Sequence, residues 1–444
     1  MFAFFSGRAS LLQSSDLLRL ADQCVKCGYC LPHCPTFRLY RDEGESPRGR
    51  IALMQGLLSG ELAQSDRLQA HLDHCLQCRA CEPACPSLVQ YGQLMDGVRA
   101  WRAARMPGWR RALPRLRLAL FSRPDGIALL AALAGLYRQL RLSRLVARWR
   151  QPRLQVLDGL ITHLQWPWQR PLPSGPAAGA ASEAPVGLFL GCVSRALQPQ
   201  VLDATVQLLS ALRIPVTMPS DQGCCGALHR HEGLVDQADR LLARNAAAFG
   251  DRRVVGVVSA CVAELGPTLD AVELCRFLLD APWPEDLTLR RSSQTVLVHA
   301  SCSHRNRLRD TAAVPALLQR IPGLRVLPLP GNDQCCGAAG SYMLRHPATA
   351  LELGDEKVRH IRRLIAEAPD ARRVPSVLVT TNSGCAVHLA SRIRAAGLDI
   401  EVLHPVELLA RHLVAADPPA PPAQEPDHTL ATSGAVSDSA RARP

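Results

Sequence analysis

The sequence predicts a multi-domain α+β protein with a mainly helical Cys-rich segment, a basic helical connector and two repeated α/β modules. Three observations support this prediction. Cysteines occur in two blocks, eight between residues 24 and 85 and nine between residues 192 and 385. The segment between the blocks is rich in Leu, Ala and Arg and is interrupted by prolines, which end helices. The second block lies in a repeat of alternating strands and helices, the pattern of a parallel sheet.

Length and composition indicate a globular chain. At about 150 residues per domain, 444 residues correspond to about three domains. The N-terminus has no basic n-region, and the longest apolar run, Ile127 to Tyr137, is too short to span a membrane. We therefore expect a cytoplasmic protein. Its 17 cysteines then predict metal binding or redox chemistry rather than a disulfide framework.

Composition shifts divide the chain into five segments. A Pro/Ala/Gly linker from Pro167 to Pro185 precedes the repeat, and the tail after about residue 417 has few large apolar residues. We therefore expect a Cys-rich domain, a basic connector with its linker, two modules and a disordered tail, at residues 1–98, 99–185, 186–290, 291–413 and 414–444.

The N-terminal block contains the run Cys-x2-Cys-x2-Cys-x3-Cys-Pro twice. Two-residue spacings let a tight loop place three thiolates on one cubane, while the fourth Cys of each run completes the other cluster. The runs therefore predict a bacterial-ferredoxin-type domain with two [4Fe–4S] clusters. The first would use Cys24, Cys27, Cys30 and Cys85, and the second Cys75, Cys78, Cys81 and Cys34.

Two zinc knuckles are the alternative to this ferredoxin domain. Zinc sites use isolated Cys pairs or Cys/His sets at longer separations, so four cysteines within eleven residues favour iron–sulfur clusters. His33, His71 and His74 lie nearby, but four cysteines already fill each cluster. We interpret these histidines as structural or surface residues.

The two modules share one order of elements. Each opens with an apolar strand that leads to a cysteine and continues with a helix, a short strand, a Cys-Cys-Gly triplet, a long helical stretch and a second apolar strand ending in cysteine. In open α/β sheets, ligands bind beyond the carboxyl ends of the strands, where these cysteines are expected. The candidate ligands are Cys192, Cys224, Cys225 and Cys261 in the first module, and Cys302, Cys335, Cys336 and Cys385 in the second.

The doubled ferredoxin run, the string Gly44–Arg50 between its halves and the two Cys-Cys-Gly modules together resemble the iron–sulfur subunit family of glycolate oxidase. The resemblance covers about residues 20 to 410. The strings Cys335–Tyr342 and Asn382–Leu389 are similar to that subunit in particular. Related families include lactate-utilisation iron–sulfur proteins, the anaerobic glycerol-3-phosphate dehydrogenase small subunit and heterodisulfide reductase subunits.

The resemblance implies an electron-transfer subunit. It would pass electrons from a partner flavin subunit, which oxidises glycolate to glyoxylate, to quinone or another respiratory acceptor. The chain contains no GxGxxG motif after a strand and no P-loop, so we expect no flavin or NAD on it and no catalytic residue. The alternatives are the iron–sulfur subunit of a D-lactate or glycerol-3-phosphate dehydrogenase, or a disulfide or quinone reductase acting at the Cys-Cys-Gly modules.

Whether the modules hold metal is open at this stage. Heterodisulfide reductase relatives bind an unusual cluster with a lone Cys, the Cys-Cys pair and a terminal Cys-x2-Cys, but Val258 and Asn382 replace the first Cys of that terminal pair here. Each module could bind a cluster through four cysteines, serve metal-free in docking, or use zinc or thiol chemistry. Cys275 is predicted to be a buried core thiol in an apolar helical stretch. The candidate extra ligands or proton carriers are His229, His231, His299, His304 and His388.

The net charge of +12 comes from one segment. Residues 99–153 contain 14 Arg and one acidic residue, a net charge of +13, so the rest of the chain sums to −1. Aromatic residues make up only 4% and no nucleic-acid motif is present, so we expect no nucleic-acid partner. The segment reads as a basic amphipathic helix that is either a solvated face or a contact with anionic lipid on the inner face of the membrane or with an acidic subunit. Its arginines include Arg115, Arg117, Arg123, Arg138, Arg141, Arg144, Arg148 and Arg150.

Overall fold

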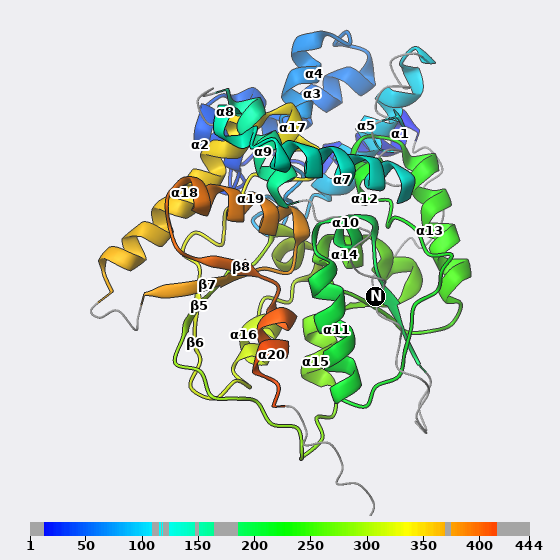
Figure 1. Ribbon diagram of the computed structural model, residues 1–444. Coiled ribbons are helices and arrows are strands. Elements are labelled where there is room, and N and C mark those ends of the chain that lie inside the picture. Colours follow the sequence, from blue (N-terminus) through cyan, green and yellow to red (C-terminus); the bar gives the residue numbers. More distant parts are fainter. Residues whose placement is uncertain are drawn as a thin grey trace, which may run out of the picture.

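The computed structural model describes residues 13–108, 115, 116, 118, 124–146, 151–163, 185–368 and 374–414. The predicted Pro/Ala/Gly linker and the tail lie outside these residues, except at their first or last positions. Figure 1 shows the N-terminal helices at one end of the molecule and the two α/β modules at the other. This arrangement of helices and parallel sheets confirms the mixed fold class.

The N-terminal region is helical, and its cysteine runs lie in the loops between helices. Ser46 caps α3 by accepting a hydrogen bond from the Gly49 amide, and Pro47 occupies the first turn, where its missing N–H costs nothing. Leu17, Met54 and Leu94 are fully buried in the core that joins the helices. The elements are α1 (Ser14–Asp22), α2 (Pro35–Tyr40), the 3₁₀ turn η1 (Glu43–Glu45), α3 (Pro47–Ser59), α4 (Asp66–Asp73) and α5 (Tyr91–Arg105).

Each module contains a four-stranded parallel sheet, as the alternation of strands and helices predicts. The first sheet has the order β2-β1-β3-β4, with β1 (Val186–Phe189), β2 (Val216–Thr217), β3 (Val254–Gly256) and β4 (Ala271–Glu273). The second has the order β6-β5-β7-β8, with β5 (Thr295–Val298), β6 (Arg325–Pro328), β7 (Pro375–Val379) and β8 (Glu401–Leu403). The fourth strand of each sheet was not predicted, because three residues carry too little pattern; β4 falls partly within the stretch expected to be helical.

One hydrophobic core extends across both modules. Strand residues of both sheets lie in it beside α11, α15, α16 and α20, and Cys275 is fully buried there, as predicted. The helices of the first module are α10 (Cys192–Leu197), α11 (Pro199–Ala211), α12 (Ala227–His231), α13 (Val235–Phe249), α14 (Ser259–Leu269) and α15 (Leu274–Asp280). Those of the second are the π-helical turn η3 (Ser303–Leu308), α16 (Ala313–Leu318), α17 (Tyr342–Arg345), α18 (Pro347–Ala366), α19 (Ser383–Ala395) and α20 (Pro405–His412).

The described part of the connector forms several helices, in line with the prolines that interrupt the segment. Helix α7 (Pro124–Gln139) and helix α8 (Ser143–Val146) are separated by a turn in which Arg141 adopts a left-handed conformation. Helix α9 (Pro152–His163) packs on α18 and α19, so it is part of the folded body. Arg117, Arg123, Arg148 and Arg150 lie outside the described residues. Among the helices that the structure describes, none is long and apolar enough to cross a membrane.

Candidate metal centres

The eight N-terminal cysteines line two neighbouring pockets. Cys24, Cys27, Cys30 and Cys85 line the first, together with Cys81. Cys34, Cys75, Cys78 and Cys81 line the second. Three cysteines of one run thus lie beside the fourth cysteine of the other run. Metal ligation by these groups stays a prediction, but soft thiolates gathered in fours are the donors that iron–sulfur clusters require.

Both ferredoxin runs curl through the same backbone conformation. The residues before the second cysteine, Lys26 and Gln77, have φ values of 55° and 52°, and the residues after it, Gly28 and Arg79, have φ values of 87° and 56°. The left-handed conformation is costly for residues other than glycine, and such strain persists where the surroundings enforce it. Repetition of this geometry in both runs indicates that the loops are shaped to turn their thiols inward.

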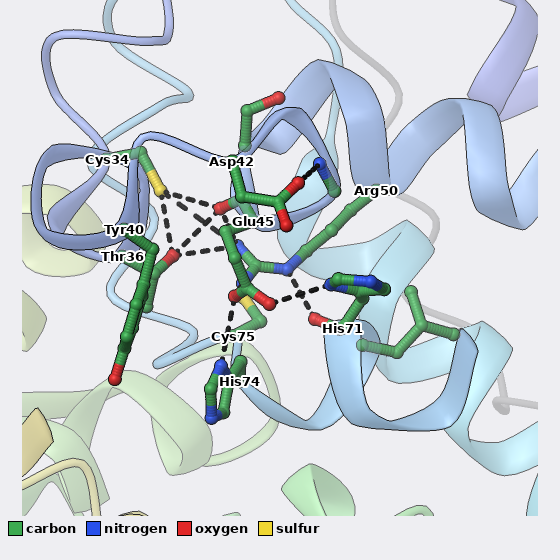
Figure 2. A network of polar contacts seen from close by, with 12 residues as sticks. Cys34, Thr36, Tyr40, Asp42, Glu45, Arg50, His71, His74 and Cys75 are labelled. Atoms are coloured by element: carbon green, nitrogen blue, oxygen red, sulfur yellow. Dashed lines mark hydrogen bonds and ion pairs between the residues drawn. The ribbon is translucent and has the colours of Figure 1, made fainter. Parts of the chain in front are cut away.

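A buried ion network supports the second pocket, and sequence reasoning did not predict it (Figure 2). Arg50 is 1% exposed and pairs with the Glu45 carboxylate at 2.5 Å. Its Nη1 donates to the Thr36 hydroxyl at 3.0 Å and lies 3.9 Å from the Cys34 sulfur. His71 contacts the other Glu45 oxygen at 2.8 Å, so that histidine is structural, as predicted.

The network keeps its ionised groups charged although they are buried. Burial alone would raise the pKa of Glu45 and lower that of Arg50. The His74, Arg50 and His71 side chains outweigh burial and lower the pKa of Glu45. Tyr91, Cys75, Cys34 and Glu45 likewise raise the pKa of Arg50. The pairing with Glu45 holds the positive charge of Arg50 beside the Cys34 thiol. The sequence signal for this network was the string Gly44–Arg50, which contains both residues.

The four cysteines of each module lie close together as free thiols. Sγ–Sγ distances are 3.5 Å for Cys192–Cys224 and 3.2 Å for Cys225–Cys261 in the first module. In the second module Cys336 and Cys385 lie 3.2 Å apart. These separations are far longer than the roughly 2.05 Å of a disulfide. Each module therefore presents a preformed pocket of thiols.

The prediction that the terminal cysteines end strands is wrong. Both cysteines lie in the first turn of a helix. Cys261 is in the first turn of α14 and Cys385 is in the first turn of α19. Strands β3 and β7 end earlier, at Gly256 and Val379, because each chain turns over the sheet edge before the cysteine is reached. The amides and dipole of a helix N-terminus stabilise a thiolate, so this position suits a metal ligand.

The backbone conformation requires glycine at the third position of each Cys-Cys-Gly triplet. Gly226 and Gly337 have φ values of 87° and 91°. A Cβ atom on Gly337 would lie 2.5 Å from the Ala350 carbonyl oxygen, and one on Gly226 would lie 3.0 Å from that of Ala238. Only glycine lets the chain approach the following long helix closely enough to turn both cysteines into the pocket.

In both triplets the first cysteine is the one held as a thiolate. Hydrogen bonds from Cys192 and Cys225, and then from His229 and the Gly226 amide, lower the pKa of Cys224 despite burial. Cys302, Cys336 and the Gly337 amide do the same for Cys335. The donating thiols have raised pKa values, because they lose their protons against a neighbouring anion.

The residues at the missing fifth cysteine position serve other purposes. Asn382 is the N-cap of α19, where its Oδ1 accepts from the Gly384 and Cys385 amides at 3.1 and 3.4 Å. Val258 precedes α14 and packs against the shared core. Neither residue is placed as a metal ligand, so each module offers four cysteines.

Among the residues that the structure describes, one of the five candidate histidines, His299, lies in a group of potential metal ligands. The donor atoms of His299, Cys336 and Cys385 all lie within 4.8 Å of one another, and all three residues are buried. Burial lowers the pKa of His299 to about 3, which keeps its imidazole neutral.

The other four candidates have partners of their own. His388 bonds to the Ala350 carbonyl at 2.9 Å, and His231 contacts Asp96 at 3.2 Å. His304 lies 3.9 Å from Glu273, and His229 acts on the Cys224 thiol. Among the described residues, none of these four histidines belongs to a group of three or more potential ligands whose donor atoms all lie within 4.8 Å of one another.

The second ferredoxin run and the second module meet. Cys78 and Cys302 pack around buried Cys335 in one small cluster with Leu76 and Tyr342. Asn306, in η3, donates to the Cys78 carbonyl at 2.7 Å. The thiol groups of two regions more than 200 residues apart in sequence therefore lie side by side.

Lys357 is a further residue that sequence reasoning missed. It is 1% exposed, donates to the Gln334 carbonyl at 2.8 Å and also bonds to the Gly331 carbonyl. Burial lowers its pKa, while electrostatic interactions with Cys336 and Cys335 oppose the shift. The sequence feature that could have pointed to Lys357 is the rarity of lysine, because only two of the 51 Lys and Arg residues are lysines.

Comparisons with known proteins agree with this architecture. The family of 4Fe-4S dicluster domains matches residues 20–89, and the cysteine-rich domain family matches residues 186–263 and 296–390. The probable glycolate oxidase iron-sulfur subunit of Bacillus subtilis is 29% identical over 87% of this chain and 92% of its own length. The glycolate oxidase iron-sulfur subunit of Escherichia coli is 29% identical over 91% and 96%.

A shorter relative shares half of the chain. Lactate utilization protein A of Geobacillus kaustophilus is 30% identical over 50% of this chain and 98% of its own length. The chain therefore belongs to the family of glycolate oxidase iron–sulfur subunits and their lactate-utilisation homologues, in which a dicluster domain precedes cysteine-rich repeats.

Proposed function

We propose that this chain is the iron–sulfur electron-transfer subunit of a glycolate oxidase complex. It would take electrons from a partner flavin subunit, where glycolate becomes glyoxylate, and deliver them to quinone or another respiratory acceptor. The observation that carries the proposal is the unbroken series of thiol groups. Cys81 lines both N-terminal pockets, and Cys78 of the second pocket packs against Cys335 of the second module.

The N-terminal pockets would hold two [4Fe–4S] clusters, which supply one-electron redox chemistry when bound. The proposed ligands of the first are Cys24, Cys27, Cys30 and Cys85, and those of the second are Cys34, Cys75, Cys78 and Cys81. The protein would hold these thiolates in place through the curled loops and would shield them from water by the helical core. Arg50 would offset the negative charge at the second site.

The flavin partner would dock at the first pocket. Cys27 is exposed, and Val25 and Tyr29, which line the same pocket, are each 68% exposed. Leu88, at 72% exposure, follows the second run directly. Exposed apolar side chains around a redox site are typical of a protein–protein contact. Electrons would therefore enter at the first pocket and leave through the second.

The test is anaerobic purification with and without the partner subunits. The isolated chain should contain about eight irons from two N-terminal clusters. Cys24→Ser should remove about four of them, whereas Cys275→Ser, a substitution of the fully buried core thiol, should remove none. Stoichiometric zinc without EPR-active iron would reject the cluster assignment. Glycolate oxidation by the reconstituted complex, measured against D-lactate and glycerol 3-phosphate, identifies the substrate.

A disulfide or quinone reductase acting at the modules is a second candidate. The lowered thiol pKa values of Cys224 and Cys335 favour it, because a thiolate is the reactive form of cysteine. In that case Cys224→Ala with Cys335→Ala would abolish turnover while the N-terminal EPR signals persist. Turnover at the parental rate would reject the reductase and favour the electron-transfer role.

Peripheral membrane contact would place the complex near its acceptor. On α7, Leu129, Leu133 and Leu136 are each more than half exposed and recur at helical spacing, and Leu140, directly after the helix, is also more than half exposed. Arg138 and Arg141 are exposed near the end of this helix. Exposed leucines on one face of the helix, with Arg138 on the opposite face, suit the surface of an anionic bilayer.

A further inference from the structure

We propose that His299 ligates an iron–sulfur centre in the second Cys-Cys-Gly module, together with Cys336 and Cys385. This inference deepens the proposed electron-transfer function. The donor atoms of the three residues lie within 4.8 Å of one another, and all three residues are buried. The imidazole thus adds a fifth donor to a module in which Asn382, whose side chain caps α19, stands in place of the fifth cysteine of the heterodisulfide reductase relatives.

The donor geometry fits a shared centre. Metal bonds of about 2.3 Å to sulfur and about 2.0 Å to imidazole nitrogen place tetrahedral ligands about 3.5–3.8 Å apart. The Cys336 and Cys385 sulfurs are 3.2 Å apart, so small movements accommodate a metal ion between them. Cys302 and Cys335 adjoin the same pocket, and five donors are more than one tetrahedral ion can use. A multi-iron centre can use all five.

A neighbouring hydroxyl orients the imidazole. His299 Nδ1 lies 3.0 Å from the Thr380 hydroxyl, which leaves Nε2 as the ring nitrogen for the metal. Metal-bound histidines usually donate their other ring N–H to a fixed acceptor, which selects the tautomer and the ring orientation. The His299 amide also donates to the Val379 carbonyl at 2.9 Å, so the backbone of this residue is anchored to β7.

The first module has no counterpart of the His299–Thr380 pair. Counting back from Cys192 and Cys302, Phe189 occupies the position of His299; counting back from Cys261 and Cys385, Gly256 occupies that of Thr380. Phe189 and Gly256 are register partners, and the phenyl ring packs with Cys225 and Cys261. The two modules thus place an apolar ring and an imidazole against equivalent cysteines. This position therefore offers a metal donor in the second module and none in the first.

The experiment uses the full chain, purified anaerobically and labelled with ¹⁵N-histidine. We expect iron beyond the roughly eight atoms of the N-terminal clusters, and pulsed EPR of the reduced protein should show a nitrogen coupling that changes with the label. His299→Ala should lose that coupling and the additional iron, while the N-terminal signals persist. His299→Cys should retain the iron without the coupling. His388→Gln, a control at a buried histidine of the same module bonded to Ala350, should match the parent.

Three results would overturn the proposal: an iron content of about eight in the parent, zinc in place of the additional iron, or an unchanged coupling in His299→Ala. Size-exclusion chromatography and the N-terminal EPR signals report folding of each variant, and His299→Cys supplies a ligand if the alanine variant fails to fold. These readouts do not involve glycolate. Failure of the histidine assignment is therefore separable from failure of the proposed oxidase function, which the reconstituted complex tests.

Discussion

Arg50 is expected to raise the reduction potential of the cluster proposed at the second N-terminal pocket. Replacing it by Gln removes a buried positive charge whose Nη1 lies 3.9 Å from the Cys34 sulfur. Reduction adds an electron, so loss of this charge should make the potential more negative. The unpaired Glu45 carboxylate would act in the same direction.

The magnitude follows from Coulomb's law. At 3.9 Å and an effective dielectric constant of about 20, the interaction at the sulfur is about 4 kcal/mol. The added electron is spread over the cluster, so we take twice that distance and about 2 kcal/mol. With 59 mV per 1.4 kcal/mol for a one-electron couple, the expected shift is roughly −90 mV.

The assay is an EPR-monitored redox titration of both N-terminal clusters. Only the potential of one cluster should move in Arg50→Gln, while Arg50→Lys, which keeps the charge, should move it much less. Arg19→Gln is the control, because Arg19 is 80% exposed and pairs with nearby Asp16. If Arg50→Gln loses iron, Arg50→Gln combined with Glu45→Gln removes the unpaired buried carboxylate. A shift below about 20 mV, or a positive one, with full iron content would refute the electrostatic reasoning.

Three further predictions concern stability and membrane contact. Burial raises the pKa of Glu273 from 4.5 to about 7, so the folded state binds the carboxyl proton more tightly than the unfolded state does. The free energy of unfolding of the parent protein should therefore fall by up to roughly 3 kcal/mol as the pH rises from 4.5 to 7. Glu273→Gln should therefore raise Tm at pH 8 but not at pH 4.5, and equal gains at both would contradict this. Asn382→Ala removes the α19 N-cap and should cost about 1 kcal/mol in thermal unfolding; an unchanged Tm would deny the cap its role. Leu133→Asp with Leu136→Asp should abolish sedimentation with anionic vesicles without changing iron content, and parental sedimentation would exclude membrane contact through α7.

Local sequence patterns predicted most of the architecture. The doubled Cys-x2-Cys-x2-Cys-x3-Cys run identified the ferredoxin-type region, because its spacing encodes a tight loop and needs no distant contact. The repeat of apolar strands and Cys-Cys-Gly triplets likewise predicted the parallel sheets. Strands β4 and β8 escaped prediction, because three-residue strands gain their identity from pairing with β3 and β7.

The chain by itself determined which residue types could act and how each run of cysteines would curl, since these depend on spacing and backbone preference over a few residues. The tertiary structure decided which of them meet. It placed Cys78 against Cys335, paired Arg50 with Glu45 near Cys34, and selected His299 from five candidate histidines by bringing it to Cys336 and Cys385. The contact of Cys78 with Cys335 and those of His299 with Cys336 and Cys385 join segments that are distant in sequence. Their electrostatic and ligand chemistry arises only when folding buries those segments together.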